Sequence, residues 1–168
     1  NDRPVEESHL WVEGSPGTFQ VRVETKNENA GLSHSRPEWV VRGPLEIQLN
    51  PSGLVLINWI DLEEYVAGVV SGEVGAKWPM EALKAQAVAA RTYVLYKKTE
   101  NYAQPFDVVA GVQDQVFHGH SVRAESVLQA VSATRGQVVT YENRPIFAAY
   151  SSTAAGPTED ALYVWALD

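Results

Sequence analysis

One carboxylate, Glu73, stands between two glycines in the segment SGEVG at residues 71 to 75. An apolar helical pattern precedes it, so the unpaired carbonyls at that helix end would present partial negative charge to the side chain. Val70, Val74 and Trp78 supply apolar neighbours, and both effects favour the protonated carboxyl that a general acid needs. Glu73 is therefore a candidate catalytic acid, although a solvated glutamate in a glycine turn is the more common meaning of such a pattern.

Three other patterns carry groups that could do chemistry. His118 and His120 are spaced to point to one side of an extended segment, as a pair of metal ligands would, but no third ligand is near in sequence. The loop AAYSSTAAGPT at residues 148 to 158 lacks the Gly-x-Ser-x-Gly elbow of a serine nucleophile, so its hydroxyls are better suited to binding a ligand or capping the loop. Arg91 lies on an alanine-rich helix, either as a solvated arginine or as a charge partner of the site.

The elements that must position these groups come in the order strands, helices, hairpin, which predicts an α+β fold. Residues 1 to 57 form a β-rich N-terminal part, because short alternating runs such as FQVRVE and LEIQL lie between turn signals. Residues 58 to 168 form the core that would hold the chemistry. We expect its C-terminal hairpin, QVVTY and PIFAAY joined by ENR, to line a groove.

Three helices are expected within that core. The first begins at Asp61, a good N-cap, and ends at Gly72 and Gly75. The second opens at Trp78 and Pro79 and has small alanines on its buried face, which predicts a central position. The third covers residues 122 to 134, with Ala124, Val127, Leu128 and Val131 facing inward.

Composition narrows the class of protein. The chain has 168 residues and a formal net charge of −8, which argues against nucleic acid as a partner, because phosphate backbones need a basic surface. It holds no cysteine, so disulfides and thiolate metal sites are excluded. The chain begins at Asn1 without a methionine, so we expect a processed or trimmed piece of a longer protein.

The segment at residues 53 to 95, GLVLINWIDLEEYVAGVVSGEVGAKWPMEALKAQAVAARTYVL, closely resembles the signature of the stage II sporulation protein D family, which includes an amidase enhancer. Two further blocks are similar to family segments: VQDQVFHG at residues 112 to 119 and YSSTAAGPTEDA at residues 150 to 161. The resemblance covers about residues 40 to 165, which is most of the chain.

The resemblance implies a lytic transglycosylase that acts on peptidoglycan. Such an enzyme cuts the β-1,4 bond between N-acetylmuramic acid and N-acetylglucosamine and leaves a 1,6-anhydro sugar. The family's catalytic glutamate falls on Glu73, and one carboxylate suffices there, whereas ordinary glycosidases use two. The positions that match the family's loops give the candidate substrate-binding residues Gln115, Tyr150, Ser152 and Thr153, and Arg91 matches a position that orients the site. No cofactor and no metal are expected.

The same resemblance implies partners and a location. The substrate would be glycan strands of peptidoglycan, stripped of stem peptides by a partner N-acetylmuramoyl-L-alanine amidase. The protein would act outside the cytoplasm, as a secreted, periplasmic or wall-anchored protein whose anchor or signal lies outside this chain. The loop departs from the family at Phe117, Ser151, Ala154 and Ala155, which removes hydroxyls and a glycine. This change modestly favours an alternative, a non-catalytic glycan-binding enhancer of such an amidase.

Overall fold

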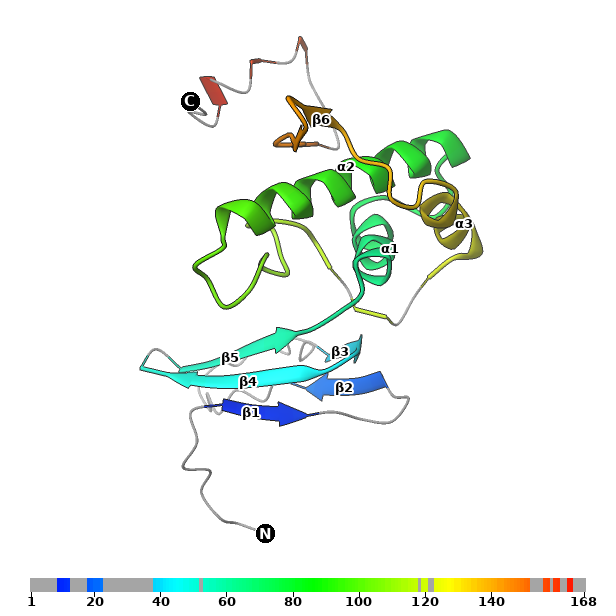
Figure 1. The fold of residues 1–168 in the computed structure, drawn as a ribbon. Coiled ribbons are helices and arrows are strands. Elements are labelled where there is room, and N and C mark those ends of the chain that lie inside the picture. The colour runs from blue at the N-terminus through cyan, green and yellow to red at the C-terminus, as the bar shows by residue number, and fades with distance from the viewer. Residues whose placement is uncertain are drawn as a thin grey trace.

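The computed structural model describes residues 9–12, 18–22, 38–51, 53–117, 119–120, 123–151, 156–157, 159–160 and 163–164. Strands occupy the N-terminal third and helices the middle of the chain, so the predicted α+β class is confirmed. In Figure 1 the strands form one layer and the helices another, with β5 leading directly into α1. The boundary between the two predicted parts, and the groove along the hairpin, stay predictions.

The β layer consists of two small antiparallel sheets. Strands β1 (His9–Val12), β4 (Leu45–Asn50) and β5 (Gly53–Asn58) form a sheet in the order β1-β4-β5. Strands β2 (Thr18–Arg22) and β3 (Glu38–Arg42) form a second, two-stranded sheet. In the first sheet the turn at the end of β4 brings β5 back antiparallel, which carries the chain to the start of α1.

Three helices build the core. Helix α1 spans Leu62–Glu73, α2 spans Met80–Glu100 and α3 spans Glu125–Ala133. Their shared interior is fully buried and consists mainly of small and branched apolar side chains, which let the helices approach closely. The side chains with no exposure are Val66, Val69, Val70, Leu83, Ala87, Ala90, Val127 and Ala130.

Local sequence explains where α1 begins but not where it ends. The Asp61 carboxylate accepts hydrogen bonds from the backbone N–H groups of Glu63 and Glu64, as expected of an N-cap. The predicted end at Gly72 is wrong, because the helix continues through Gly72 to Glu73. Glu73 is therefore the last helical residue, and its side chain projects from the helix itself.

The other helix predictions need two small corrections. Pro79 is the N-cap of α2 rather than its first helical residue, and α3 begins at Glu125, later than predicted. Leu128 was expected to face inward, but it is 39% exposed, whereas Val127 and Val131 of the same helix are buried.

The predicted hairpin is present but short. Strands β6 (Thr140–Tyr141) and β7 (Arg144–Pro145) flank a two-residue turn in which Glu142 and Asn143 have φ of 48° and 61°. Positive φ at both positions is the geometry of a type I′ turn, which matches the twist of the strands. The hairpin lies along α2, where the Val139 N–H donates to Thr92 Oγ1 at 3.0 Å.

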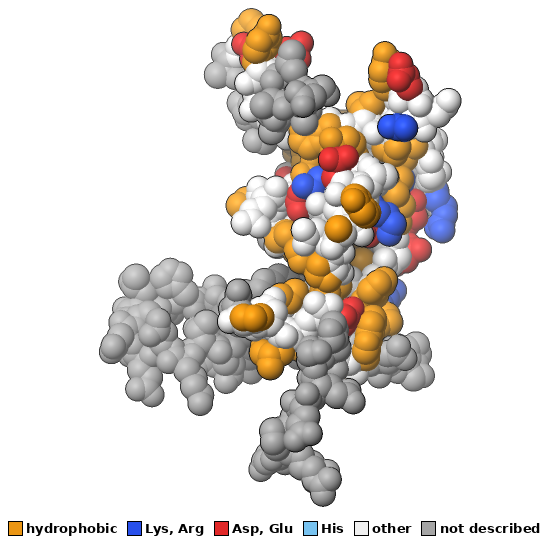
Figure 2. Space-filling view, turned by 60° about the vertical axis from the view of Figure 1, so that its left-hand side comes forward, with side chains coloured by type: hydrophobic (Ala, Val, Ile, Leu, Met, Phe, Trp, Pro, Cys, Tyr) orange, Lys and Arg blue, Asp and Glu red, His pale blue; other side chains and the backbone are white. Residues whose placement is uncertain are grey.

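A loop after residue 117 fastens the helical layer to the sheets. Gly119 has φ of +73°, and a Cβ there would lie 2.4 Å from the Val40 carbonyl oxygen of β3, so a side chain does not fit. The neighbouring His120 N–H donates to the same carbonyl at 2.6 Å. On the face drawn in Figure 2, acidic and basic side chains are interspersed among apolar ones.

Candidate active site

Glu73 is half-buried at the C-terminal end of α1 and is held by a loop from elsewhere in the sequence. The Val116 backbone N–H donates to its Oε1 at 2.7 Å. Hydrogen bonds from N–H groups to a carboxylate are charge-assisted and stronger than neutral ones. The loop thus compensates the unfavourable placement of a carboxylate beside helix carbonyls.

Tyr150 brings a phenol against the same carboxylate. Burial, and then the negative charge of Glu73, raise the pKa of Tyr150 well above its ordinary value, and a hydrogen bond to Glu73 acts in the same direction. The phenol therefore keeps its proton across the physiological range. A protonated phenol beside a carboxylate is a hydrogen-bond donor, so Tyr150 can stabilise the ionised form of Glu73.

Gln115 is 1% exposed, and its amide is fully used inside the protein. Its Oε1 accepts from the Tyr65 hydroxyl at 3.0 Å. Its Nε2 donates to the Ala90 carbonyl oxygen at 3.3 Å and to the Tyr150 hydroxyl at 3.1 Å. Both amide hydrogens are thereby occupied, so Gln115 reaches Glu73 through Tyr150.

Asp114 anchors the loop that supplies these contacts. Its Oδ1 accepts from the Tyr93 hydroxyl at 3.0 Å and lies 3.1 Å from Lys97 Nζ, and its Oδ2 accepts from the Val109 N–H at 2.8 Å. Burial alone would raise the pKa of Asp114, but the Val109 N–H and the Lys97 ammonium outweigh it and lower that pKa. A permanently ionised Asp114 fixes the loop to α2.

Arg91 lies in the helical core, where it has no exposure to solvent. Its Nε and Nη2 donate to the two Glu63 carboxylate oxygens at 2.9 and 2.6 Å, and its Nη1 donates to the Gln137 carbonyl oxygen at 3.1 Å. These bonds join α1, α2 and the segment that follows α3. The structure therefore places Arg91 as an internal tie between elements, with the charge partner Glu63.

The remaining sequence candidates divide as follows. Ser152 and Thr153 lie outside the described residues, as does His118. His120 contacts Glu64 at 3.5 Å, and burial, followed by the charges of Arg123 and Arg42, lowers its pKa. In the part of the chain that the structure describes, no cluster of three or more His, Asp or Glu side chains could hold a metal ion.

Sequence reasoning missed three parts of the site. Tyr65 belongs to the apolar stripe of α1 and was taken only as a core residue, because nothing local shows that its hydroxyl meets Gln115. The Val116 contribution is a backbone N–H, which no residue type can reveal. Gln86 was also missed: its Nε2 is buried with no close hydrogen-bond partner among the described residues, and the amide acts on the Tyr150 phenol as a donor.

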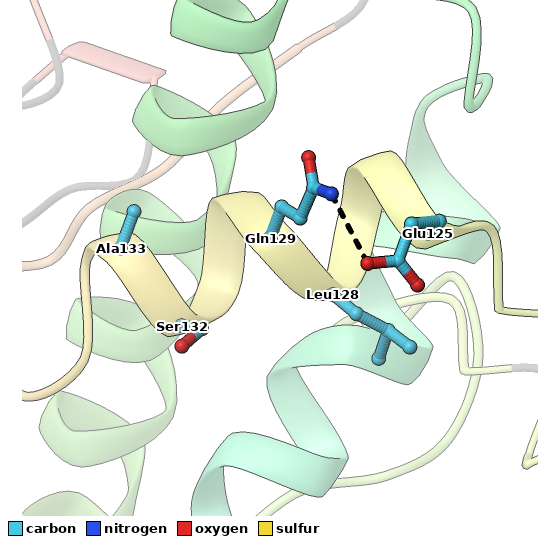
Figure 3. A pocket seen from close by; sticks show the side chains of 5 residues that line it. All are labelled: Glu125, Leu128, Gln129, Ser132 and Ala133. Carbon is cyan, nitrogen blue, oxygen red and sulfur yellow. Dashed lines mark hydrogen bonds between the residues drawn. The ribbon is translucent and has the colours of Figure 1, made fainter.

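A shallow depression lies on the outer face of α3, apart from these residues. Figure 3 shows that its lining comes from successive turns of that one helix, and a hydrogen bond of 3.1 Å joins Gln129 to Glu125 across it. The lining residues are Glu125, Leu128, Gln129, Ser132 and Ala133. This surface offers no group beyond ordinary helix side chains, so we place the candidate site at Glu73.

The structure thus defines an α+β domain that presents one carboxylate at a helix end, held by a buried polar loop. The family model described as "SpoIID: Stage II sporulation protein" matches residues 50–141, more than half of the chain, and the chain belongs to that family. The family resemblance inferred from the sequence is confirmed. None of the described helices is long and apolar enough to cross a membrane.

Three relatives illustrate the similarity. Stage II sporulation protein D of Bacillus subtilis is 35% identical over 161 residues, which is 87% of this chain and 46% of that protein. The amidase enhancer of Bacillus subtilis is 42% identical over 98 residues, 58% of this chain and 13% of that protein. An uncharacterized protein of Brachyspira hyodysenteriae is 41% identical over 113 residues, 67% of this chain and 31% of that protein. The chain spans less than half of the length of each.

Proposed function

We propose that this domain is a peptidoglycan lytic transglycosylase in which Glu73 is the general acid and then the general base. The observation that carries the proposal is the setting of Glu73: one half-buried carboxylate with an N–H donor on one oxygen and a phenol beside it. The nearest candidate for a second carboxylate, Asp114, is occupied by Tyr93, Val109 and Lys97. One available carboxylate suits a reaction in which the sugar supplies its own nucleophile.

The reaction has two proton transfers, both at Glu73. Protonated Glu73 gives its proton to the glycosidic oxygen as the bond from that oxygen to C1 of N-acetylmuramic acid breaks. The leaving N-acetylglucosamine gains a 4-hydroxyl. The resulting carboxylate then takes the proton of the 6-hydroxyl, whose oxygen bonds to C1 and closes the 1,6-anhydro ring. No water is consumed, and Glu73 ends protonated as it began.

The other site residues take supporting roles in this proposal. Val116 N–H and the Tyr150 hydroxyl stabilise the carboxylate that exists between the two transfers. Ser152 and Thr153 stay our candidates for contacts to the sugar, on the strength of the family resemblance. The substrate would be denuded glycan strands outside the cytoplasm, prepared by an N-acetylmuramoyl-L-alanine amidase.

The test is product analysis by mass spectrometry after digestion of denuded peptidoglycan in water enriched in ¹⁸O. We expect saccharides that end in 1,6-anhydro-N-acetylmuramic acid and carry no ¹⁸O, because the nucleophile is internal. Glu73→Gln keeps the size of the side chain and removes the proton transfer, so it should abolish the product. Reducing ends labelled with ¹⁸O, or full activity of Glu73→Gln, would contradict the proposal.

A second candidate function is a non-catalytic enhancer that binds glycan and stimulates an amidase. The observation that favours it is the relative whose name is amidase enhancer. In that case glycan pull-down and stimulation of a purified N-acetylmuramoyl-L-alanine amidase survive Glu73→Ala, and no anhydro product forms with the wild-type protein. The two functions therefore differ in their dependence on a single side chain.

A further inference from the structure

A continuous chain of hydrogen bonds runs from the first turns of α1 to the carboxylate at its end. The Tyr65 hydroxyl donates to Gln115 Oε1, Gln115 Nε2 donates to the Tyr150 hydroxyl, and that hydroxyl contacts Glu73. The next residue after Gln115, Val116, donates its backbone N–H to Glu73. Two consecutive loop residues thus act on Glu73, one directly and one through a phenol.

The direction of each bond in this chain is fixed by its neighbours. Gln115 Nε2 also donates to the Ala90 carbonyl oxygen, which can only accept. A flipped amide would set Oε1 against that carbonyl and would lose the donation from Tyr65, so the observed orientation is the one that satisfies all partners. The Tyr150 oxygen must therefore accept from Gln115.

A phenol has one proton, and its oxygen here is occupied by an incoming donor. Gln86 adds a second amide donor that acts on the same phenol. With amide donors on this side of the oxygen, the phenol proton has its acceptor on the other side, in the Glu73 carboxylate. The buried setting strengthens these bonds, because the local dielectric is low.

We propose that Gln115 is a positioning residue that directs the proton of Tyr150 onto Glu73, and that Tyr65 locks the amide in the orientation that does so. The proposal rests on the proposed function of Glu73 and assigns Gln115 a role other than contact with substrate. During the reaction the directed phenol stabilises the carboxylate that forms after the first proton transfer. Without that direction the phenol is free to turn away, and Glu73 holds its proton more tightly.

The central variant is Gln115→Met, which keeps the length of the side chain and removes the donor. We expect kcat to fall about tenfold with KM little changed, the size of one weakened hydrogen bond to a charged group. The basic limb of the pH–rate profile should move to higher pH, because the protonated acid persists longer. Tyr65→Phe should shift both quantities in the same direction by less.

A double-mutant cycle separates positioning from direct binding. If Gln115 acts through Tyr150, then Gln115→Met has no further effect on kcat in a Tyr150→Phe background. If Gln115 touches the glycan, KM rises in both backgrounds, and the proposal is overturned. Gln129→Met makes the same substitution on the exposed face of α3 and should leave kcat, KM and the profile unchanged.

A readout independent of turnover keeps this proposal distinct from the proposed function. The titration of the Glu73 carboxyl, followed by ¹³C NMR in the full chain, should move to higher pH in Gln115→Met and in Tyr150→Phe. Asp114 and Tyr93 also act on the buried phenols, but Asp114 stays ionised and Tyr93 protonated over that range. An unmoved titration in folded variants overturns the positioning role, whereas absence of anhydro product with a moved titration overturns only the catalytic function.

Discussion

Replacing Arg91 with methionine tests whether this residue holds the domain together or holds the glycan. The guanidinium is fully buried, and the Glu63 carboxylate that it pairs with is 15% exposed. Arg91→Met leaves that carboxylate without its bidentate partner and removes the donor to the Gln137 carbonyl. Breaking one side of a buried ion pair costs about 3–5 kcal/mol, so we expect the free energy of unfolding to fall by about that amount.

The same helix provides a matched control. Lys84 pairs with Glu81 at 2.7 Å, but the Glu81 side chain is 82% exposed, so Lys84→Met should cost about 0–1 kcal/mol. The double variant Arg91→Met with Glu63→Met removes both buried charges, and it should recover most of the loss, because no unpaired charge remains in the interior.

Urea unfolding followed by tryptophan fluorescence measures these differences, and glycan affinity is measured below the unfolding transition of each variant. We expect Arg91→Met to bind glycan as the wild type does wherever it is folded. A loss of stability below about 1 kcal/mol would refute the role as an internal tie, since it would fall in the range of exposed pairs. Loss of glycan affinity at unchanged stability would restore the substrate-binding role expected from the family resemblance.

Two further predictions concern the packing and the charge of the loop. Gly68→Ala would place a Cβ 2.4 Å from Phe117 Cε2, so we expect the ring to shift and the free energy of unfolding, measured in urea, to fall by about 1–3 kcal/mol; unchanged stability would contradict the close packing. Asp114 has a lowered pKa when folded, so its stabilisation is complete above the unfolded value of 3.8 and is lost as pH falls through the folded value. Asp114→Asn should therefore be less stable than wild type at neutral pH, with a difference that shrinks in acid, as urea unfolding at several pH values would show; a constant difference would refute this.

The sequence predicted the helices well because their signals are local. The Asp61 cap, the apolar stripe of α1 and the small residues of α2 each depend on neighbours within one or two turns, and each is present in the structure. The errors also have local causes. Gly72 is a common helix terminator, yet the packing of α1 against α2 and α3 outweighs its low propensity by one further turn.

The surroundings of Glu73 could not be predicted from spacing, since its donors come from residues more than forty positions away. Gln115 was found only through the family resemblance, which does not say whether a side chain faces substrate or protein. The structure answers that question for Gln115 and for Arg91, because both have their polar groups occupied internally. Family motifs thus mark residues that matter, and burial decides how they act.

Helix α1 carries acids at both ends, and the two ends differ in what they need. Near its start a carboxylate is favoured by the helix dipole, and Glu63 is available to pair with Arg91. At its end Glu73 is opposed by the same dipole, so it needs donors from another part of the chain. The loop that supplies them is itself fixed by Asp114 to α2 and by Gln115 to both helices.

It follows that the site around Glu73 exists only when this loop is docked. The loop buries few apolar groups of its own, and charge-assisted and buried polar hydrogen bonds hold it in place. A substitution such as Asp114→Asn should therefore weaken the setting of Glu73 without touching it, in proportion to the population of undocked loop. Stability of the loop and protonation of the acid are two readings of the same set of contacts.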